Sequence, residues 1–418
     1  MSGLRRIFKL RTSSLVSCVL AVMLWGVSAV GQDQSGELPS PSQQHEASNS
    51  GTQQPADKVS EPSPLSTPAI TGPLNPVPPI TLEAGPLGKV NLNGVISGMG
   101  IWQGSRVAGD DNTQSALSNG QLFIQKSTGW WQFYVQPGAY NILALGTPFI
   151  KTETAISDLY SPIPVAYLKL APTNSFSVMV GALPTVMGAE YTFDFQNMNV
   201  QRGLLWNQEN AINRGIQLNQ TIGKFTASLS WNDGFYSNRY SWLSGSLTYV
   251  NGVHSLAFAG MGNLGRTVFR TLATPVQNNS SMYALVYTYT KDKWIMQPYV
   301  QYSNVPANAE AGVAKSASTI GGALLLTRKF SHGISLSGRG EYIASTGRST
   351  DHSINLLYGP GSSAWSITLT PTYQYQRFFT RGDISFVRAN DYAPGAVFGR
   401  SGTSRNQPRG VVEVGLLF

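Results

Sequence analysis

The chain has 418 residues, of which 41% are hydrophobic and 12% are charged, with a net charge of +8 and one cysteine. A single cysteine excludes a disulfide framework and a thiolate metal site. The cations are dispersed along the chain, so the basic balance does not indicate nucleic-acid binding, and we expect no nucleic-acid partner.

Residues 1–31 resemble an export signal. A positive segment precedes an apolar run at residues 15–30, and small residues follow at 29–31. The positive segment consists of Arg5, Arg6, Lys9 and Arg11. One alternative is a membrane anchor, but the run is shorter than the ~20 residues that a spanning helix needs. Another is a lipoprotein signal at Cys18, but the apolar run continues past that cysteine.

Residues 32–88 are rich in proline, serine and glutamine and contain almost no aromatic residue. Such a segment cannot bury enough apolar surface to offset its conformational entropy. We therefore predict a disordered periplasmic leader. Attachment to peptidoglycan or to a periplasmic partner is an alternative, since proline-rich stretches act as semi-extended spacers.

Short alternating segments begin at Lys89 and continue to the last residue. In residues 365–375 every odd position is apolar, aromatic or proline, whereas every even position is Ser, Thr or Gln. Residues 334–342 alternate in the same way. A period of two indicates β-strands with one apolar face and one polar face.

Short links alternate with long polar stretches through residues 89–418. Short links are expected near Gly223, residues 251–252, 291–293, 359–363 and 393–395, and the longest polar stretch lies between residues 184 and 213. Outer-membrane barrels have this asymmetry, with short periplasmic turns and long outer loops. The predicted fold is all-β: a closed antiparallel transmembrane β-barrel of 14–18 strands, with eighteen as the best estimate.

The final strand of the sequence carries an insertion signal typical of such barrels. Val412, Val414, Leu416 and Phe418 fall on one face, whereas Glu413 falls on the other. We expect this apolar face to meet lipid and the barrel-insertion machinery to read the terminal phenylalanine. A secreted all-β domain is the alternative, but its outward face would carry more charge than these strands do.

Two glycine-rich blocks carry a resemblance to a known family. The first is Gly181-x-x-Pro184-x-x-x-Gly188-x-Glu190, followed by Asn197-x-Asn199-x-x-Arg202-Gly203 and Arg214-Gly215. The second is Phe379-x-Arg381-x-Asp383-x-Ser385, followed by Gly395-x-x-Phe398-Gly399 and Asn406-Gln407-x-Arg409-Gly410. The chain resembles the OmpL-like β-barrel porin family and, more distantly, the phosphate-selective porins. This resemblance implies a passive diffusion channel in the outer membrane of Gram-negative bacteria.

The sequence offers no catalytic constellation, so we predict no enzyme activity, no catalytic residue, no metal site and no cofactor. The four histidines have no metal-ligand spacing. Gly260-Met-Gly262-Asn-Leu-Gly265 matches the dinucleotide pattern, but a polar loop follows it in place of the helix that would hold a pyrophosphate.

Charged residues that could line the lumen are the candidate functional residues. Residues 90–418 hold 23 Lys and Arg against 15 Asp and Glu, a net charge of 23 − 15 = +8. The long stretch after Leu183 could fold back into the barrel and narrow the pore. Alternatively, it could lie over the rim or contain a strand pair near residues 191–200. The candidates are Glu190, Asp194, Arg202, Glu209, Arg214, Arg339, Glu341 and Glu413.

These observations predict a porin for small hydrophilic solutes or ions, with a mild anion preference because the barrel is basic. The alternatives are a phosphate- or anion-selective channel, an outer-membrane barrel enzyme, and a structural or adhesive barrel. The expected partners are outer-membrane lipids, lipopolysaccharide and the insertion machinery. A homotrimer is an analogy with other porins.

Overall fold

The computed structural model describes residue 70, residues 72–266 and residues 276–418. The predicted signal peptide at residues 1–31, and the predicted leader as far as residue 69, lie outside the described residues.

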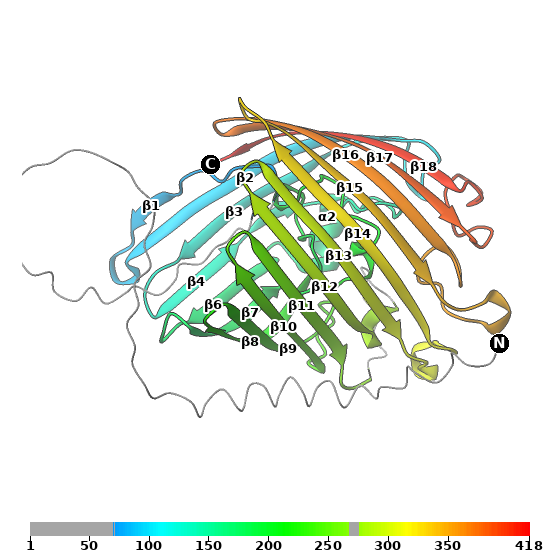
Figure 1. Cartoon of the computed structure of the whole chain (residues 1–418), viewed down its shortest axis with the longest axis horizontal. Helices are drawn as coiled ribbons and strands as arrows, with labels where there is room; N and C mark the ends of the chain where they lie inside the picture. The colour runs from blue at the N-terminus through cyan, green and yellow to red at the C-terminus, as the bar shows by residue number, and fades with distance from the viewer. Residues whose placement is uncertain (1–69, 71, 267–275) are drawn as a thin grey trace, which may run out of the picture. The chain divides into compact units, whose positions relative to one another are not determined.

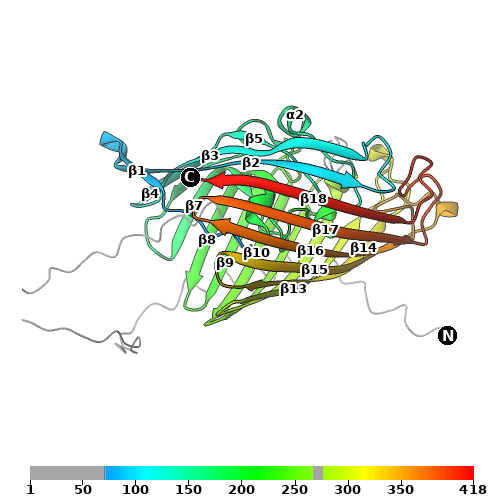
Figure 2. The same ribbon diagram turned by 90° about the horizontal axis from the view of Figure 1, so that it is seen from above.

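Sixteen antiparallel strands close into a barrel, because the last strand pairs with the first strand of the ring (Figures 1 and 2). The strands are β2 (Lys89–Gln103), β3 (Thr113–Lys126), β4 (Trp131–Gln136), β6 (Val165–Leu170), β7 (Phe176–Pro184), β8 (Ile212–Ile222), β9 (Phe225–Asn232), β10 (Trp242–Asn251), β11 (His254–Asn263), β12 (Ser281–Lys291), β13 (Trp294–Val305), β14 (Ala317–Lys329), β15 (Ile334–Ser345), β16 (Ser363–Tyr375), β17 (Phe378–Asn390) and β18 (Asn406–Leu417). Within the ring of these sixteen described strands closure leaves no unpaired edge strand, as the hydrocarbon core of a membrane requires.

Two further strand elements explain how eighteen elements form sixteen spanning strands. β1 (Ile80–Glu83) pairs with the start of β2 and adds a short hairpin to it. β5 (Gly138–Tyr140) pairs with β3 next to β4, from which Pro137 separates it. Proline has no N–H to donate to the ladder, so one spanning strand is broken into two elements. The predicted range of 14–18 strands is confirmed, and the best estimate of eighteen spanning strands was two too many.

The connections show why the estimate was too high. The short links predicted near Gly223 and residues 291–293 join neighbouring strands. The links predicted at residues 359–363 and 393–395 are not periplasmic turns, because they fall at the ends of two long loops, 346–362 and 391–405. Glycine and proline mark both kinds of connection, so residue type alone did not separate them.

Strand alternation divides each spanning strand between lipid and lumen. On β18, Val412 and Val414 are 58% and 57% exposed, whereas Glu413 between them is 0% exposed. The backbone of Phe418 exchanges two hydrogen bonds with Gly94 of β2, at 2.6 and 2.9 Å. The predicted apolar face therefore points away from the barrel interior and the terminal residue completes the closure. Reading of Phe418, Leu416, Val414 and Val412 by the insertion machinery stays a prediction.

Helical segments in the described residues are short. They are η1 (Gly85–Leu87), α2 (Thr152–Thr154), η2 (Ala155–Tyr160), η3 (Asp194–Gln196), η4 (Trp206–Gln208), η5 (Gln277–Asn279), η6 (Ala309–Ala311) and η7 (Ser349–Asp351).

Among the described residues, no helix has the length and apolar character needed to cross a membrane.

The predicted start of the barrel at Lys89 coincides with the first residue of β2. The stretch before it differs from the prediction, because residues 80–83 form β1 within the expected disordered leader of residues 32–88. Leu74, which precedes β1, is only 2% exposed and packs in an apolar cluster. A few aliphatic side chains in a proline-rich stretch can be buried where the barrel already provides an apolar surface for them.

Candidate functional site: the inner loop and the lumen wall

The connection between β7 and β8, residues 185–211, lies inside the barrel and is called the inner loop. Pro184 ends β7, and the loop runs through η3 and η4 before Ile212 begins β8. Residues such as Phe195, Asn199 and Leu205 are 0% exposed. Residues 191–200 form bends and the single turn η3, so the alternative of a strand pair there does not hold.

One side of the inner loop is held by aromatic packing. Phe193 lies 5.1 Å from Tyr140, and Phe195 lies 5.6 Å from Phe123, measured between ring centroids. Tyr134 of β4 stacks on Phe123 and extends this cluster along the wall. Aromatic pairs of this kind each add about 0.5–1.5 kcal/mol beyond the area that they bury.

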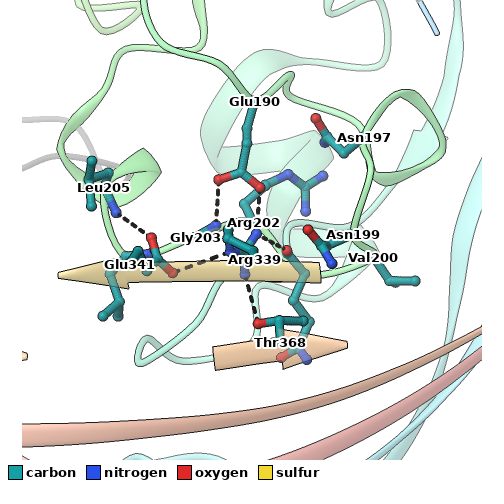
Figure 3. A network of polar contacts seen from close by, with 12 residues as sticks. Glu190, Asn197, Asn199, Val200, Arg202, Gly203, Leu205, Arg339, Glu341 and Thr368 are labelled. Atoms are coloured by element: carbon teal, nitrogen blue, oxygen red, sulfur yellow. Dashed lines mark hydrogen bonds and ion pairs between the residues drawn. The ribbon is translucent and has the colours of Figure 1, made fainter. Parts of the chain in front are cut away.

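The other side of the inner loop is held by an ion network centred on Arg339 of β15 (Figure 3). Arg339 donates to Glu190 Oε1 at 2.6 Å and to the carbonyl of Gln201 at 2.7 Å. Its Nε lies 3.3 Å from Glu341 Oε1. Glu341 also accepts from the backbone N–H of Leu204 at 2.8 Å. The guanidinium thus joins two carboxylates, one from the loop and one from its own strand.

A second contact lies on β17. Asp383 accepts hydrogen bonds from the N–H of Val200 at 2.9 Å, from Gln201 Nε2 at 2.6 Å and from the Thr370 hydroxyl at 3.0 Å. Backbone N–H groups are obligatory donors, and a buried carboxylate is an effective acceptor for them. This aspartate therefore fixes the backbone of the inner loop as well as one of its side chains.

Arg381 of β17 fixes the loop through its carbonyl groups. It donates to the carbonyls of Asp194 at 3.0 Å and Asn197 at 2.9 Å. Its guanidinium also lies 3.7 Å from Glu413, which is its cross-strand neighbour on β18. All of these side-chain groups are excluded from solvent, so each buried charge has an opposite charge or a backbone dipole beside it.

Arg409 of β18 extends the set to the loop between β5 and β6. It donates to the carbonyls of Ala144 at 2.9 Å and Thr147 at 3.1 Å, and to Gln103 Oε1 at 2.9 Å. It also reaches Gln201 Oε1 of the inner loop at 3.2 Å. The charged wall, defined here as the lumen-facing residues of β15–β18, therefore contacts two loops within the barrel.

The structure brings most of the predicted lumen residues together. Glu190, Arg339 and Glu341 form the ion network, and Glu413 lies beside Arg381. Asp194 accepts from Asn119 of β3 on the opposite side of the loop. These positions agree with a loop inside the lumen, and their role in limiting or selecting solutes stays a prediction.

Arg202 is also inside the barrel, but its contacts are with other loop residues and not with the charged wall. It donates to the carbonyl of Leu143 at 3.0 Å and to the carbonyl of Thr192, and it lies 5.4 Å from the ring of Trp206. It is 0% exposed. Burial lowers the pKa of Arg202 below its usual value, and Asp194 and Glu190 oppose that shift.

Arg214 does not join this set, and its predicted place in the lumen stays a prediction. In the strand register it lies opposite Ala182, on the face of β8 that also carries the exposed Ile216. Its guanidinium pairs with Asp233 of the next outer loop at 2.8 Å and lies 4.0 Å from the Tyr236 ring.

Two loop carboxyls have raised pKa values. Burial raises the pKa of Glu190 above its usual value, although Arg339 pulls it downward. Burial raises the pKa of Glu209 well above its usual range, and Glu190 and Glu341 shift it in the same direction. Both carboxylate oxygens of Glu209 are buried without a hydrogen-bond partner. An unpaired buried carboxyl favours its neutral form.

Three members of the charged wall were not among the predicted lumen residues: Arg381, Asp383 and Arg409. A signal was present, because Phe379, Arg381, Asp383 and Ser385 alternate with Thr380, Ile384 and Phe386 along β17. On β18, Arg409 lies on the same face as Glu413, which was one of the predicted lumen residues. Strand parity would have placed all three in the lumen. It would not have predicted their contacts with the inner loop, whose partner residues lie 182 to 208 positions away in the sequence.

The opposite part of the barrel has a different inner surface. The uncharged wall, defined as the lumen-facing residues of β8–β13, has no acidic or basic side chain along these fully described strands. Asn219 accepts from Ser228 at 2.8 Å and donates to Ser177 at 3.3 Å, and Gln297 donates to Thr288 at 3.2 Å. Several of these side chains are partly exposed, unlike those of the charged wall.

Two partly exposed lysines face the lumen near the periplasmic ends of other strands. Lys169 of β6 lies opposite Gln132 and Lys329 of β14 lies opposite Ser335, and both partners are buried on the inner face. Within the part of the chain that the structure describes, no three His, Cys, Asp or Glu side chains form a group that could hold a metal ion.

Comparisons with known proteins agree with this architecture. Residues 89–418 match the sequence profile of the family described as "Putative beta-barrel porin-2, OmpL-like". No curated protein matches the sequence. Among solved structures, an anion-selective porin from Comamonas acidovorans aligns with a TM-score of 0.56 at 14% identity, over 79% of this chain and 99% of that one.

Two other solved structures are similar. The outer membrane channel DcaP of Acinetobacter baumannii aligns with a TM-score of 0.54 at 10% identity, over 82% of this chain and 100% of its own. OmpF of Salmonella typhi, in complex with daunomycin, aligns with a TM-score of 0.51 at 12% identity, over 79% of this chain and 98% of its own. At such identities the likeness concerns the fold alone.

Proposed function

Because the chain belongs to the OmpL-like β-barrel porin family of the bacterial outer membrane, we propose that it is a porin through which small hydrophilic solutes diffuse, with a mild preference for anions. The observation that carries this proposal is the inner loop, which is held inside a closed barrel by Arg339, Arg381 and Asp383. A loop fixed in the lumen reduces the cross-section of the pore and leaves the membrane-spanning strands unchanged.

In this proposal solutes pass along the partly exposed part of the uncharged wall, because Gln301 and Met282 of the same wall are buried against the inner loop. The hydroxyl and amide groups of Asn219, Ser228 and Gln297 can exchange hydrogen bonds with a passing solute. Such groups replace part of the solute's hydration without binding it strongly, as rapid passive diffusion requires. The charged wall is occupied by the loop and contributes rigidity.

The mild anion preference depends on Lys169 and Lys329. The charged wall carries three arginines and three carboxylates, so its own charges offset one another: Arg339, Arg381, Arg409, Glu341, Asp383 and Glu413. The two lysines are partly exposed and face the lumen, where a positive potential raises the local concentration of anions. A phosphate-selective channel would need guanidinium groups free to bind its ligand, and the arginines of the charged wall are engaged.

The proposed partners follow from the surface and the fold. Exposed aliphatic and aromatic side chains along the outer face would contact outer-membrane lipids, and lipopolysaccharide would surround the outer loops. The insertion machinery would receive the strand that ends at Phe418. A homotrimer remains part of the proposal by analogy with other porins. A passive channel needs no cofactor and no catalytic residue.

Planar-bilayer recordings of the purified, folded protein test the function. We expect discrete conductance steps, and a reversal potential in a salt gradient that indicates a mild anion preference. Folded protein that produces no conductance steps would contradict a porin. A Lys169→Gln, Lys329→Gln double variant should conduct with the reversal potential moved toward zero. An unchanged reversal potential in that variant would remove these lysines from the proposal.

A further inference from the structure

The residues just before β1 lie against the inside of the barrel wall. Residue 70 and residues 72–79 are called the N-terminal segment. Leu74 is 2% exposed and belongs to the cluster that contains Phe123 of β3, Phe195 of the inner loop and Leu417 of β18. Ile70 and Val77 pack against the same cluster. Because the residues of this cluster face the lumen, the N-terminal segment that packs against them lies inside the barrel.

The segment is anchored by polar contacts at strand ends. Gln374, near the last residue of β16, accepts from the N–H of Asn75 at 2.7 Å and donates to its carbonyl at 3.0 Å. Lys329, the last residue of β14, donates to Asn75 Oδ1 at 3.1 Å. On the other side, Asn93 of β2 donates to the carbonyl of Val77 at 3.3 Å.

These anchors place the segment at the periplasmic mouth. The turns that follow β14 and β16 are short, which is the periplasmic type of connection. In the order of the ring, β2 and β14 are separated by β15–β18. A segment that reaches from Asn93 to Lys329 therefore runs across the inside of several strands at this end and occupies part of the opening.

The segment also touches the inner loop. A β-carbon on Gly72 would collide with the backbone carbonyl of Asn197, so the segment approaches that loop as closely as a glycine allows. The same carbonyl accepts from Arg381 of β17 at 2.9 Å. Asn197 is thus held between the charged wall and the N-terminal segment.

From these contacts we infer that the N-terminal segment is a second constriction element, which narrows the periplasmic mouth and supports the inner loop from below. This inference rests on the proposed porin function. It assigns the size limit of the channel to two separate parts of the chain, the inner loop at mid-barrel and the N-terminal segment at the exit. Displacing the segment widens the passage while leaving all sixteen spanning strands intact.

Gly72→Leu tests this inference within the full chain. The new side chain cannot fit against Asn197, so it displaces the segment. We expect single-channel conductance to rise roughly twofold, as for a wider passage, and larger neutral sugars to enter proteoliposomes. Gly100→Leu is the matched control, because a β-carbon there meets nothing within 4 Å and the position is exposed on β2. The control should conduct like the unmodified protein.

A thiol at position 74 reports where the segment is, independently of conductance. The sequence has one cysteine, Cys18, within the predicted signal peptide, so Leu74→Cys introduces the single thiol of the exported chain. The buried thiol should resist a maleimide in the otherwise unmodified chain and react in the Gly72→Leu background.

The outcomes separate this inference from the proposed function. A protected thiol in the Leu74→Cys variant, with labelling and raised conductance once Gly72→Leu is added, supports a constriction. Free labelling of the Leu74→Cys variant, or labelling with unchanged conductance after Gly72→Leu, overturns the inference while leaving the porin intact. A thiol that stays protected in the Gly72→Leu background also overturns it, because the close contact with Asn197 would then not exist. Absence of any channel in the unmodified protein would instead contradict the proposed function.

Discussion

The charged wall of β15–β18 and the uncharged wall of β8–β13 belong to one sheet, but their polar side chains differ in charge and in exposure. On the charged wall, Arg339, Arg381 and Asp383 are buried and contact the inner loop. On the uncharged wall, Asn219 and Ser228 contact each other and remain partly exposed. The charges of the first wall are paired and hold the inner loop, whereas the partly exposed side chains of the second wall are neutral.

This division has a physical reason. A loop buried inside a barrel must satisfy its backbone donors and acceptors, and ionised side chains form the strongest hydrogen bonds to them. A wall that solutes pass over needs many weak, interchangeable hydrogen bonds instead. Pairing the charges of the charged wall under the loop also limits the field that they exert on the proposed passage.

The largest expected effect comes from Arg339→Ala on the charged wall. Glu190 and Glu341 would then be buried without their cation, at a cost of about 3–5 kcal/mol. We expect the inner loop to leave its site, conductance to rise and the heat-modifiable barrel to unfold at a lower temperature. Ser246→Ala, on the uncharged wall, is the control and should change neither property. An Arg339→Ala variant with the parent's conductance and unfolding temperature would show that the ion network does not hold the loop.

Much of the fold could be predicted because the strands of a barrel alternate between two faces, and this alternation is visible in the sequence. Period-two alternation marked the strands, and the position of Lys89 marked the start of β2. The even number of strands within the predicted range followed from alternating short and long connections. The count itself was uncertain because Pro137 divides one strand and because glycines in outer loops resemble those in tight turns.

The candidate site was predictable in part. Glu190, Arg339 and Glu341 were among the predicted lumen residues, and the structure brings them together, whereas their role at the pore stays a prediction. Their mutual contacts were not predictable, because the pair Arg339–Glu190 spans 149 positions in the sequence. The N-terminal segment was missed for the same reason: its composition suggests disorder, and the wall that orders it is formed by distant strands.

A smaller effect is expected from Glu209→Gln in the inner loop. The raised pKa of Glu209 means that the folded protein holds its proton more tightly than the unfolded chain does. Its favourable, neutral form is complete below the usual carboxyl pKa and is lost as the pH rises through the raised value. Glutamine removes this dependence, so the variant should gain about 1–3 kcal/mol relative to the parent at alkaline pH.

Thermal unfolding of both proteins between pH 4 and pH 9, spanning roughly the ordinary carboxyl range and above, provides the measurement. The two curves should coincide at the acid end and separate as the pH rises. Glu190→Gln is the contrasting control, because that carboxylate pairs with Arg339 and its loss should destabilise the barrel. A parent whose stability relative to Glu209→Gln is the same at every pH would mean that Glu209 has an ordinary pKa.

Selectivity should respond to a charge placed on the uncharged wall. Asn219→Asp introduces a carboxylate where Ser228 and Ser177 already surround the side chain, so the barrel should fold normally. Its field acts directly on ions in the proposed passage, and we expect the reversal potential to move toward cation preference at low salt, where screening is weakest. The same reversal potential as the parent would mean that solutes do not pass along this wall.

The smallest effect is expected from Arg214→Gln, at a residue that pairs with Asp233 of an outer loop. The substitution removes the ion pair with Asp233, but that aspartate keeps the backbone N–H of position 214, at 2.8 Å, and of Asn238, at 3.1 Å. Because Arg214 has a side chain that is 31% exposed, the lost pair should cost no more than about 1 kcal/mol. Conductance and reversal potential should be those of the parent, since the guanidinium is paired with Asp233 and donates to the Tyr236 carbonyl of an outer loop. Bilayer recordings at low salt, where screening is weakest, compare Arg214→Gln with the parent. Lys169→Gln, which removes a lumen-facing cation, is the positive control. A shift in the reversal potential of Arg214→Gln as large as that of Lys169→Gln would place Arg214 in the path of ions after all, and the division of the lumen into a charged and an uncharged wall would then be incomplete.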